Sequence, residues 1–180
     1  MPPIPPLESF GGRIMICGPS NSGKSTLATA IGSATGLPVV HLDRLRFVPH
    51  TNWVDRPADD FAHDVAEAAS AASWIIEGNY FTWIAPRLAR ATGIILLNDT
   101  RIRNYARYLR RSLFDRSRAG RLDGASEAIN WKMTRWILWD EPRRRGPKLD
   151  LLRAAGLPVL EIHGMSELSR LYAAWGLARG

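Results

Sequence analysis

Short apolar runs alternate with longer segments of helical periodicity along this chain. The short runs are largely apolar throughout, which is typical of strands buried on both faces; they cover 13–17, 38–43, 73–77, 93–97 and 157–162. Patterns typical of helices lie between them, over 57–72, 84–91, 100–118, 126–139 and 167–177. This alternation predicts an α/β fold with five parallel strands and helices on both faces. Ligands of such sheets bind at the carboxyl ends of the strands.

The start of the chain differs in composition from the rest. Residues 1–11 are rich in proline, which fixes φ and supplies no amide donor, so a disordered or extended arm is expected there. Residues 12–180 are expected to form a single domain, because a chain of 180 residues can bury one core without a second unit.

Composition narrows the class of protein further. Hydrophobic residues make up 46% and charged residues 23% of the chain, which is ordinary for a globular protein and excludes a collagen-like or largely disordered one. The single cysteine, Cys17, cannot form an intramolecular disulfide, so a cytoplasmic location is expected. The start lacks the pattern of a secretion signal, and nowhere do about 18 apolar residues run together. No membrane partner is therefore expected.

One glycine-rich segment carries recognisable chemistry. Gly18-Pro-Ser-Asn-Ser-Gly-Lys-Ser25 fits the pattern G-x-x-x-x-G-K-[ST], and it lies between the first predicted strand and a helix that begins at Lys24. Glycines let successive amides turn inward and bind phosphate, and the helix N-terminus adds to the attraction. Lys24 is expected to bridge the β- and γ-phosphates, and Ser25 to place its hydroxyl on Mg²⁺. The predicted ligand is a nucleoside triphosphate, ATP with GTP as the alternative, bound by Gly18, Ser20, Asn21, Ser22, Gly23, Lys24, Ser25 and Thr26. The competing interpretation is a plain glycine turn that caps a helix, with Lys24 as a solvated charge.

Positive charge is concentrated in one part of the chain. The net charge is +7, and the segment 101–148 alone holds 14 basic and 5 acidic residues. Such a block attracts any anion, so it fits a polyphosphate, a nucleic acid or a merely solvated surface. Nucleic acid is the less favoured partner, because the segment carries no helix-turn-helix or other base-reading pattern.

The order of several features resembles the adenylate-kinase-like P-loop kinases, and most closely the branch named for its relation to DNA topology modulation. Besides the P-loop, the likeness rests on His41-Leu-Asp43, Trp53, Trp74-Ile-Ile-Glu-Gly-Asn-Tyr80, Arg101 and Trp136-Ile-Leu-Trp139, and it covers roughly 13–162. The resemblance implies a P-loop NTPase three-layer sandwich with a small acceptor-binding insertion at 44–72 and an arginine-rich lid at 116–145. It also implies phosphoryl transfer from ATP to a small-molecule or nucleotide acceptor.

The resemblance also suggests roles for single residues. Glu77 matches a carboxylate that holds a water on Mg²⁺, and Asp43 matches an acidic residue near the acceptor hydroxyl, suited to act as a base. Arg107 falls where adenylate kinases stack an arginine on adenine. Arg111 follows one turn later on the same helix face, where both could meet one nucleotide. The expected catalytic residues are Lys24, Asp43, Arg107 and Arg111, and the expected metal site involves Ser25 and Glu77.

The chain departs from the family pattern at the acceptor side. Nucleoside monophosphate kinases clamp the acceptor phosphate with an arginine three residues after the Asp-Gly that ends strand 3, and this chain has Phe81 there. Substitutes for the clamp are available at Arg44, Arg46, Arg56 and Arg87. After the fourth strand, Asn98 and Thr100 stand where relatives usually have aspartate and proline.

Three interpretations remain open from the sequence. The favoured one is a phosphotransferase, and the others are a nucleotide-dependent nucleic-acid-binding or regulatory protein and a slow NTPase without a true acceptor. The cluster Arg143-Arg-Arg145 fits phosphate binding, nucleic-acid binding or solvent exposure. For His41 a structural role is favoured, and the tryptophans near Trp136 are expected to pack on the core rather than to stack on bases.

Overall fold

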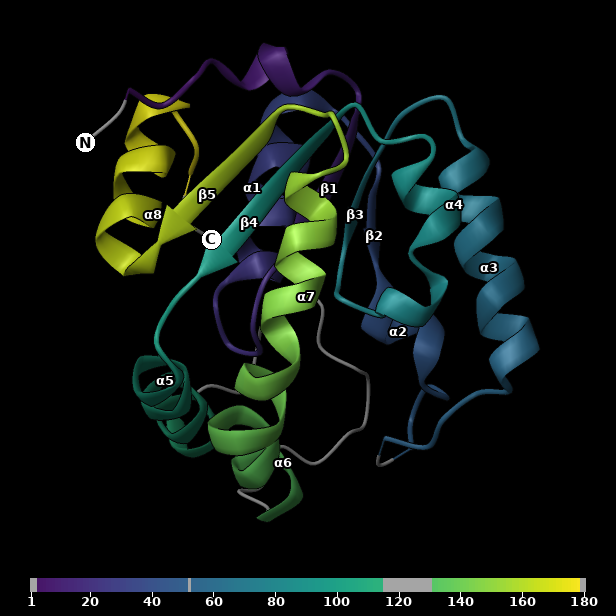
Figure 1. Ribbon diagram of the computed structural model, residues 1–180, viewed down its shortest axis with the longest axis vertical. Helices are drawn as coiled ribbons and strands as arrows, with labels where there is room; N and C mark the ends of the chain where they lie inside the picture. The colour runs from purple at the N-terminus through teal and green to yellow at the C-terminus, as the bar shows by residue number, and fades with distance from the viewer. Residues whose placement is uncertain (1–2, 52, 115–130, 179–180) are drawn as a thin grey trace.

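The computed structural model describes residues 3–51, 53–114 and 131–178. Its centre is one parallel sheet with the strand order β2-β3-β1-β4-β5 (Figure 1). The strands are β1 (Arg13–Cys17), β2 (Val39–His41), β3 (Trp74–Glu77), β4 (Gly93–Asn98) and β5 (Val159–His163). All four strand pairs are parallel, with β1 between β3 and β4. The predicted five-stranded parallel sheet is therefore confirmed.

Helices connect the strands and cover the sheet. In chain order they are η1 (Leu7–Phe10), α1 (Lys24–Thr35), α2 (Leu42–Arg46), α3 (Ala58–Ser70), η2 (Phe81–Trp83), α4 (Ala85–Leu88), α5 (Arg101–Phe114), α6 (Trp131–Arg135), η3 (Trp136–Asp140), α7 (Glu141–Arg153) and α8 (Gly164–Ala174). Among the described residues, no helix is both long and apolar enough to cross a bilayer.

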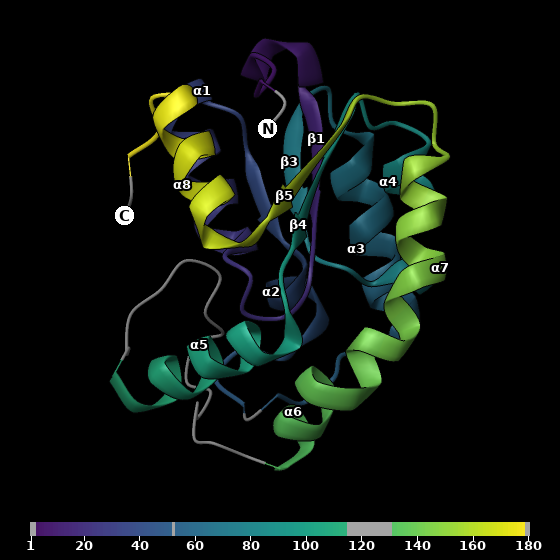
Figure 2. The same cartoon turned by 60° about the vertical axis from the view of Figure 1, so that its left-hand side comes forward.

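The predicted three-layer arrangement is confirmed by the two cores. Alternate residues of β1 face opposite sides of the sheet, because side chains alternate along a strand. Ile14 and Ile16 pack with residues of α1 and α8 on one face, and Met15 and Cys17 pack with residues of α3, α4 and α7 on the other. Figure 2 shows these two helix layers on either side of the sheet.

The proline-rich start is not the expected disordered or extended arm where the structure describes it. Residues 7–10 form a 3-10 helix, and Phe10 is 1% exposed. Ile4 and Leu7 pack against the α1–α8 core, and the indole of Trp175 donates a hydrogen bond to the carbonyl of Pro5 at 2.9 Å. Apolar side chains between the prolines cover the core edge, so burial fixes a segment that has few backbone hydrogen bonds.

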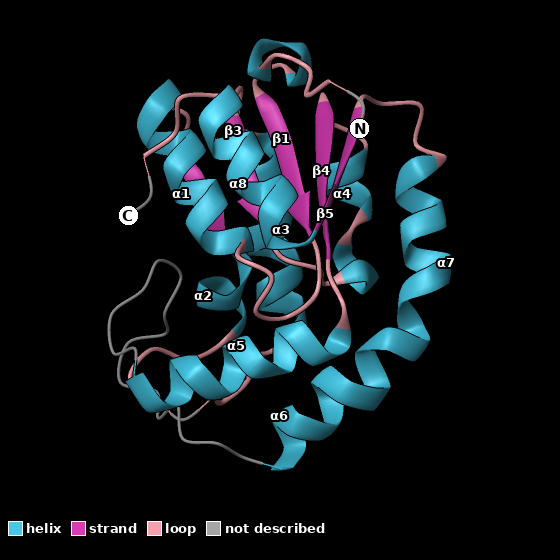
Figure 3. Cartoon of the chain, turned by 90° about the vertical axis from the view of Figure 1, so that its left-hand side faces the viewer, coloured by secondary structure: helices cyan, strands magenta, loops and turns pink. Residues whose placement is uncertain are grey.

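Two segments expected to serve the substrate also contribute to the main body. In the region 44–72, α3 buries Phe61, Val65 and Ala69 against the sheet, so this part of the expected insertion is a core helix. In the expected lid, residues 131–145 belong to α6, η3 and the start of α7, whose last residue is Arg153. The rest of the expected lid, 116–130, lies outside the described residues. The α5 and α6 helices lie beyond the carboxyl ends of the strands (Figure 3).

Candidate functional site

The loop from Gly18 to Gly23 links β1 to α1 at the carboxyl edge of the sheet. Gly18, Asn21 and Gly23 have positive φ angles of 158°, 62° and 94°. A side chain at Gly18 would place its Cβ 2.6 Å from the carbonyl oxygen of Leu97, so only glycine fits between β1 and β4. Left-handed residues among right-handed ones point successive amides the same way, which forms an anion-binding concavity.

Asn79 holds the start of this loop. The amide of Gly18 donates to Asn79 Oδ1 at 3.1 Å, and Asn79 Nδ2 donates to the Gly18 carbonyl at 2.9 Å. The reciprocal pair ties the first loop residue to the segment after β3. Sequence reasoning gave Asn79 no role, although its position directly after Glu77-Gly78 at a strand end was a signal.

The structure brings Ser25 and Glu77 together, as expected. Ser25 Oγ donates to Glu77 Oε1 at 2.9 Å, and His41 Nδ1 lies 2.9 Å from the same oxygen. Glu77 is 3% exposed. Burial alone would raise the pKa of Glu77, but the His41 hydrogen bond, the Lys24 charge and the Ser25 hydrogen bond outweigh it and hold the pKa below its usual value. The carboxylate is therefore ionised and oriented beside the serine hydroxyl.

Lys24 begins α1 and lies over the loop. Its Nζ donates to the carbonyl of Pro19 at 3.2 Å. The ammonium is thus folded back along the loop. In the loop Ser22 is buried, and in the first turn of α1 Thr26 is exposed.

A carboxylate that sequence reasoning missed also contacts the loop. The amide of Ser20 donates to both oxygens of Glu141, at 3.0 Å and 3.2 Å. Glu141 is the first residue of α7 and is 8% exposed. Burial raises its pKa, whereas the charge of Lys24 and the Ser20 hydrogen bond act in the opposite direction.

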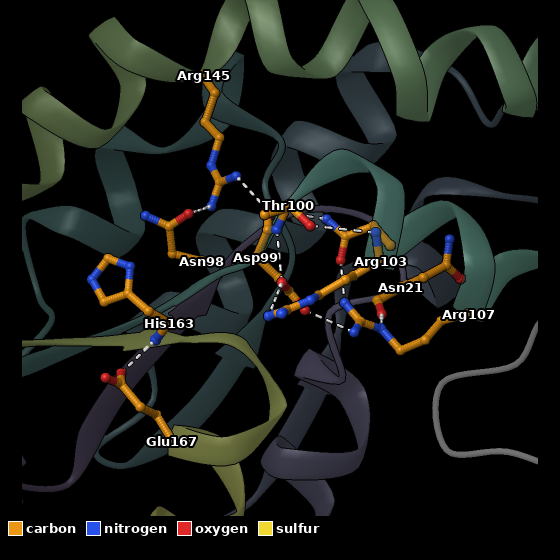
Figure 4. Close-up of polar contacts among 10 residues, drawn as sticks. Asn21, Asn98, Asp99, Thr100, Arg103, Arg107, Arg145, His163 and Glu167 are labelled. Atoms are coloured by element: carbon orange, nitrogen blue, oxygen red, sulfur yellow. Dashed lines mark hydrogen bonds and ion pairs between the residues drawn. The ribbon is translucent and has the colours of Figure 1, made fainter.

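Arg107 reaches the loop from α5, and its stacking on adenine stays a prediction. Its Nε donates to the carbonyl of Asn21 at 2.6 Å, and its Nη1 lies 2.7 Å from Asp99 Oδ2 (Figure 4). For Arg111 the structure describes the backbone within α5 but not the side chain, so its pairing with Arg107 remains a prediction.

Arg145 comes from α7 to the end of β4. Its Nη2 donates to Asn98 Oδ1 at 2.6 Å and its Nη1 to the Asp99 carbonyl at 3.3 Å (Figure 4). Burial lowers the pKa of Arg145, and the charges of Glu141 and Asp99 counteract this. Of the three alternatives for the arginine cluster, solvent exposure alone therefore does not describe Arg145. It binds the carboxyl end of the strand next to the loop.

The sequence suggested that Asp43 lies at the tip of the second strand, and this prediction is wrong. β2 ends at His41, and Asp43 lies in the first turn of α2. The hydroxyl of Tyr80 donates to Asp43 Oδ1 at 2.6 Å. Burial and the Asp43 charge raise the pKa of Tyr80, so the phenol stays protonated and remains a donor. Tyr80 has a φ of 28°, a strained value for a residue other than glycine.

Three of the four arginines considered as an acceptor clamp already have protein partners. Arg87 is 0% exposed and donates to the carbonyls of Gly78 and Asn79 at 3.0 Å and 2.9 Å, so it supports the loop after β3. Arg46 pairs with Asp55 at 3.3 Å, and Arg56 pairs with Asp64 at 2.5 Å. Arg44 is exposed.

Comparison with solved structures adds likenesses at low sequence identity. No protein-family model matches the chain, and neither does any curated protein. A gluconokinase from Sinorhizobium meliloti 1021 is 18% identical, with 92% of this chain and 95% of that chain covered and a TM-score of 0.48. A sugar kinase from Janibacter sp. HTCC2649, in an unliganded structure, is 15% identical, with 89% and 91% covered and a TM-score of 0.49. Similarity at this level says nothing about the activity of this chain.

Proposed function

We propose that this chain is an ATP- and Mg²⁺-dependent phosphotransferase with a small acceptor. The observation that carries the proposal is the loop of Gly18 to Ser25 at the carboxyl edge of the sheet, with Lys24 over it and Glu77 paired to Ser25. Inward amides, a helix N-terminus and one ammonium are the groups that stabilise the charge of a transferring phosphoryl group. Gly18, Ser20, Asn21, Ser22, Gly23, Lys24, Ser25 and Thr26 would bind the donor.

The donor set beside the loop fits Mg²⁺. The Ser25 hydroxyl and an ionised, nearly buried Glu77 carboxylate lie within 2.9 Å of each other. Hard oxygen ligands of this kind suit Mg²⁺, which keeps several waters and is shared with the nucleotide phosphates. Ser25 would bind the ion directly and Glu77 would hold one of its waters. The bound ion would supply charge neutralisation between the β- and γ-phosphates.

The acceptor would bind at Asp43. Its carboxylate is fixed by the Tyr80 hydroxyl, and Tyr80 follows the same strand end that carries Glu77. A fixed carboxylate can orient an acceptor hydroxyl and take its proton. Arg46, Arg56 and Arg87 have partners of their own, which favours a hydroxyl-bearing small molecule over a nucleoside monophosphate. Membership of the adenylate-kinase-like kinases, and of the branch related to DNA topology modulation, is part of the same proposal.

An acceptor panel tests this function. Nucleosides, nucleoside monophosphates and small polyols are added to protein with Mg²⁺ and ATP, and acceptor-stimulated ADP release is measured. One class should stimulate ADP release. Asp43→Asn should reduce the stimulated rate about 100-fold, which is the effect of removing a positioned base. Basal ADP release with no stimulation by any class would favour the slow NTPase instead.

A second candidate function rests on one surface observation. The expectation that Trp131 and Trp139 pack on the core is wrong, because the two residues are 72% and 42% exposed. Their ring centroids lie 6.3 Å apart. Arg135 and Arg143 line the same depression. Exposed rings beside arginines suit stacking on the bases of single-stranded nucleic acid. Binding of an oligonucleotide that weakens steeply with salt would support this function, and no binding at low salt would exclude it.

A further inference from the structure

A protein carboxylate occupies one of the loop's amide donors. Both oxygens of Glu141 accept from the Ser20 amide, and the contact joins residues 121 positions apart. Glu141 begins α7, and its side chain is 8% exposed. An ionised carboxylate is costly to bury unless charge and hydrogen bonds compensate it. Here the Ser20 amide of the Gly18–Gly23 loop supplies such a hydrogen bond.

The surroundings of Glu141 are those of an anion site. Burial raises its pKa, and Lys24, the Ser20 amide, Arg145 and Lys148 all favour its charged form. The Lys24 ammonium is held at the carbonyl of Pro19, in the same peptide group whose amide, that of Ser20, holds Glu141. In a P-loop the lysine reaches the β- and γ-phosphates, whereas the loop amides further along bind the inner phosphates. Glu141 therefore lies on the terminal-phosphate side of the loop.

We propose that Glu141 occupies the position of the terminal phosphate of ATP and thereby sets the preference of the site among nucleotides. The proposal rests on the proposed function, since it requires the loop to bind nucleotide. A triphosphate must displace the carboxylate, because two anions cannot share the Ser20 amide and the Lys24 charge without strong repulsion. A diphosphate fills only the inner part of the loop and leaves Glu141 in place. Glu141 is thus a specificity-determining residue that weakens ATP relative to ADP.

Displacement of Glu141 also affects α7. The helix carries Arg145, which is bound to Asn98 and the Asp99 carbonyl at the end of β4. Because Glu141 and Arg145 are one turn apart on the same helix face, release of the first loosens the attachment of the second. ATP, and not ADP, should therefore increase hydrogen exchange at the start of α7.

Calorimetric titration of two nucleotides tests the proposal. Dissociation constants for ATP and ADP, each with Mg²⁺, are measured on the wild type, Glu141→Gln and the control Asp150→Asn. Asp150 lies on the same helix with its side chain 71% exposed, so its replacement removes the same charge away from the loop. Glu141→Gln should lower the dissociation constant for ATP about tenfold and that for ADP less than about twofold. Asp150→Asn should change neither dissociation constant. Glu141→Ala, which also removes the acceptor for Ser20, should tighten ATP at least as much.

The outcomes separate this inference from the proposed function. Equal tightening of ATP and ADP would show a general charge effect and overturn the inference, as would unchanged or weaker ATP binding by both Glu141 variants at an unaltered melting temperature. In those cases the wild type still binds nucleotide and the proposed function stands. A wild type that binds neither nucleotide would overturn both.

Discussion

Replacement of Arg87 by methionine should destabilise the protein strongly, although the residue has no direct part in chemistry. Arg87 is 0% exposed and donates to the carbonyls of Gly78, Asn79 and Tyr80 at 3.0, 2.9 and 3.3 Å. Methionine has a similar length and no donor, so one buried and two partly buried carbonyls lose the hydrogen bond from Arg87 at about 1–2 kcal/mol each. Burial lowers the pKa of Arg87, and removal of this desolvated charge offsets part of the loss. The expected net loss is about 3 kcal/mol, by the same reasoning.

Urea unfolding followed by circular dichroism measures this loss. A change of this size corresponds to a fall in melting temperature of roughly 6–12 °C for a domain of this length. Arg90→Met is the matched control, because Arg90 is exposed and its side chain donates only a long hydrogen bond of 3.5 Å to Ala71. Its effect should stay within about 0.5 kcal/mol. Arg87→Lys should not restore stability, because an ammonium cannot reach three carbonyls with the geometry of the guanidinium fork. Equal stability of the Arg87→Met and Arg90→Met variants would refute the reasoning.

Three further variants test other parts of the site. Asn79→Ala leaves both backbone groups of Gly18 without their partner, so calorimetry should show ATP binding about tenfold weaker; unchanged affinity would argue against a supporting role. Tyr80→Phe keeps the ring contact with Phe61 but removes the donor to Asp43, so acceptor-stimulated turnover should fall about tenfold with the ATP dissociation constant unchanged. Burial raises the pKa of Glu141, so the folded state binds a proton at the Glu141 carboxylate more tightly than the unfolded chain does. The free energy of unfolding of the wild type should therefore fall relative to that of Glu141→Gln as the pH rises from about 4. A stability difference that stays constant from pH 4 to 8 would contradict that direction.

Local sequence pattern was sufficient for the fold and for the position of the glycine-rich loop between β1 and α1. Strands that are buried on both faces leave uninterrupted apolar runs, such as Ile94 to Leu97, which the sheet buries fully. The P-loop pattern is contiguous, so its glycines specify their backbone geometry without help from distant residues. The resemblance to the adenylate-kinase-like kinases was what paired Ser25 with Glu77, and the two lie at the same edge of the sheet because β1 and β3 are neighbours.

Contacts between distant segments could not be read in this way. Glu141 stands in an arginine-rich segment, where a carboxylate is typical of a solvated counter-charge. Arg87 follows a proline in a largely apolar stretch, but arginine is rarely fully buried, so its burial was not expected. Asp43 was predicted to end the second strand but lies in α2, because an apolar run does not show where a strand ends and a helix begins. In each case tertiary packing decided the role of the side chain.

The most direct test of the central claim is calorimetric titration of ATP with Mg²⁺ into the wild type and Lys24→Ala. The control is Lys132→Ala, which removes the same charge from an exposed position in α6. Loss of one well-placed cation at the phosphates should weaken binding by about 3 kcal/mol, or roughly 100-fold, at a temperature where each protein is folded. The account predicts this loss for Lys24→Ala alone. Equal ATP affinity of the wild type and Lys24→Ala would contradict it.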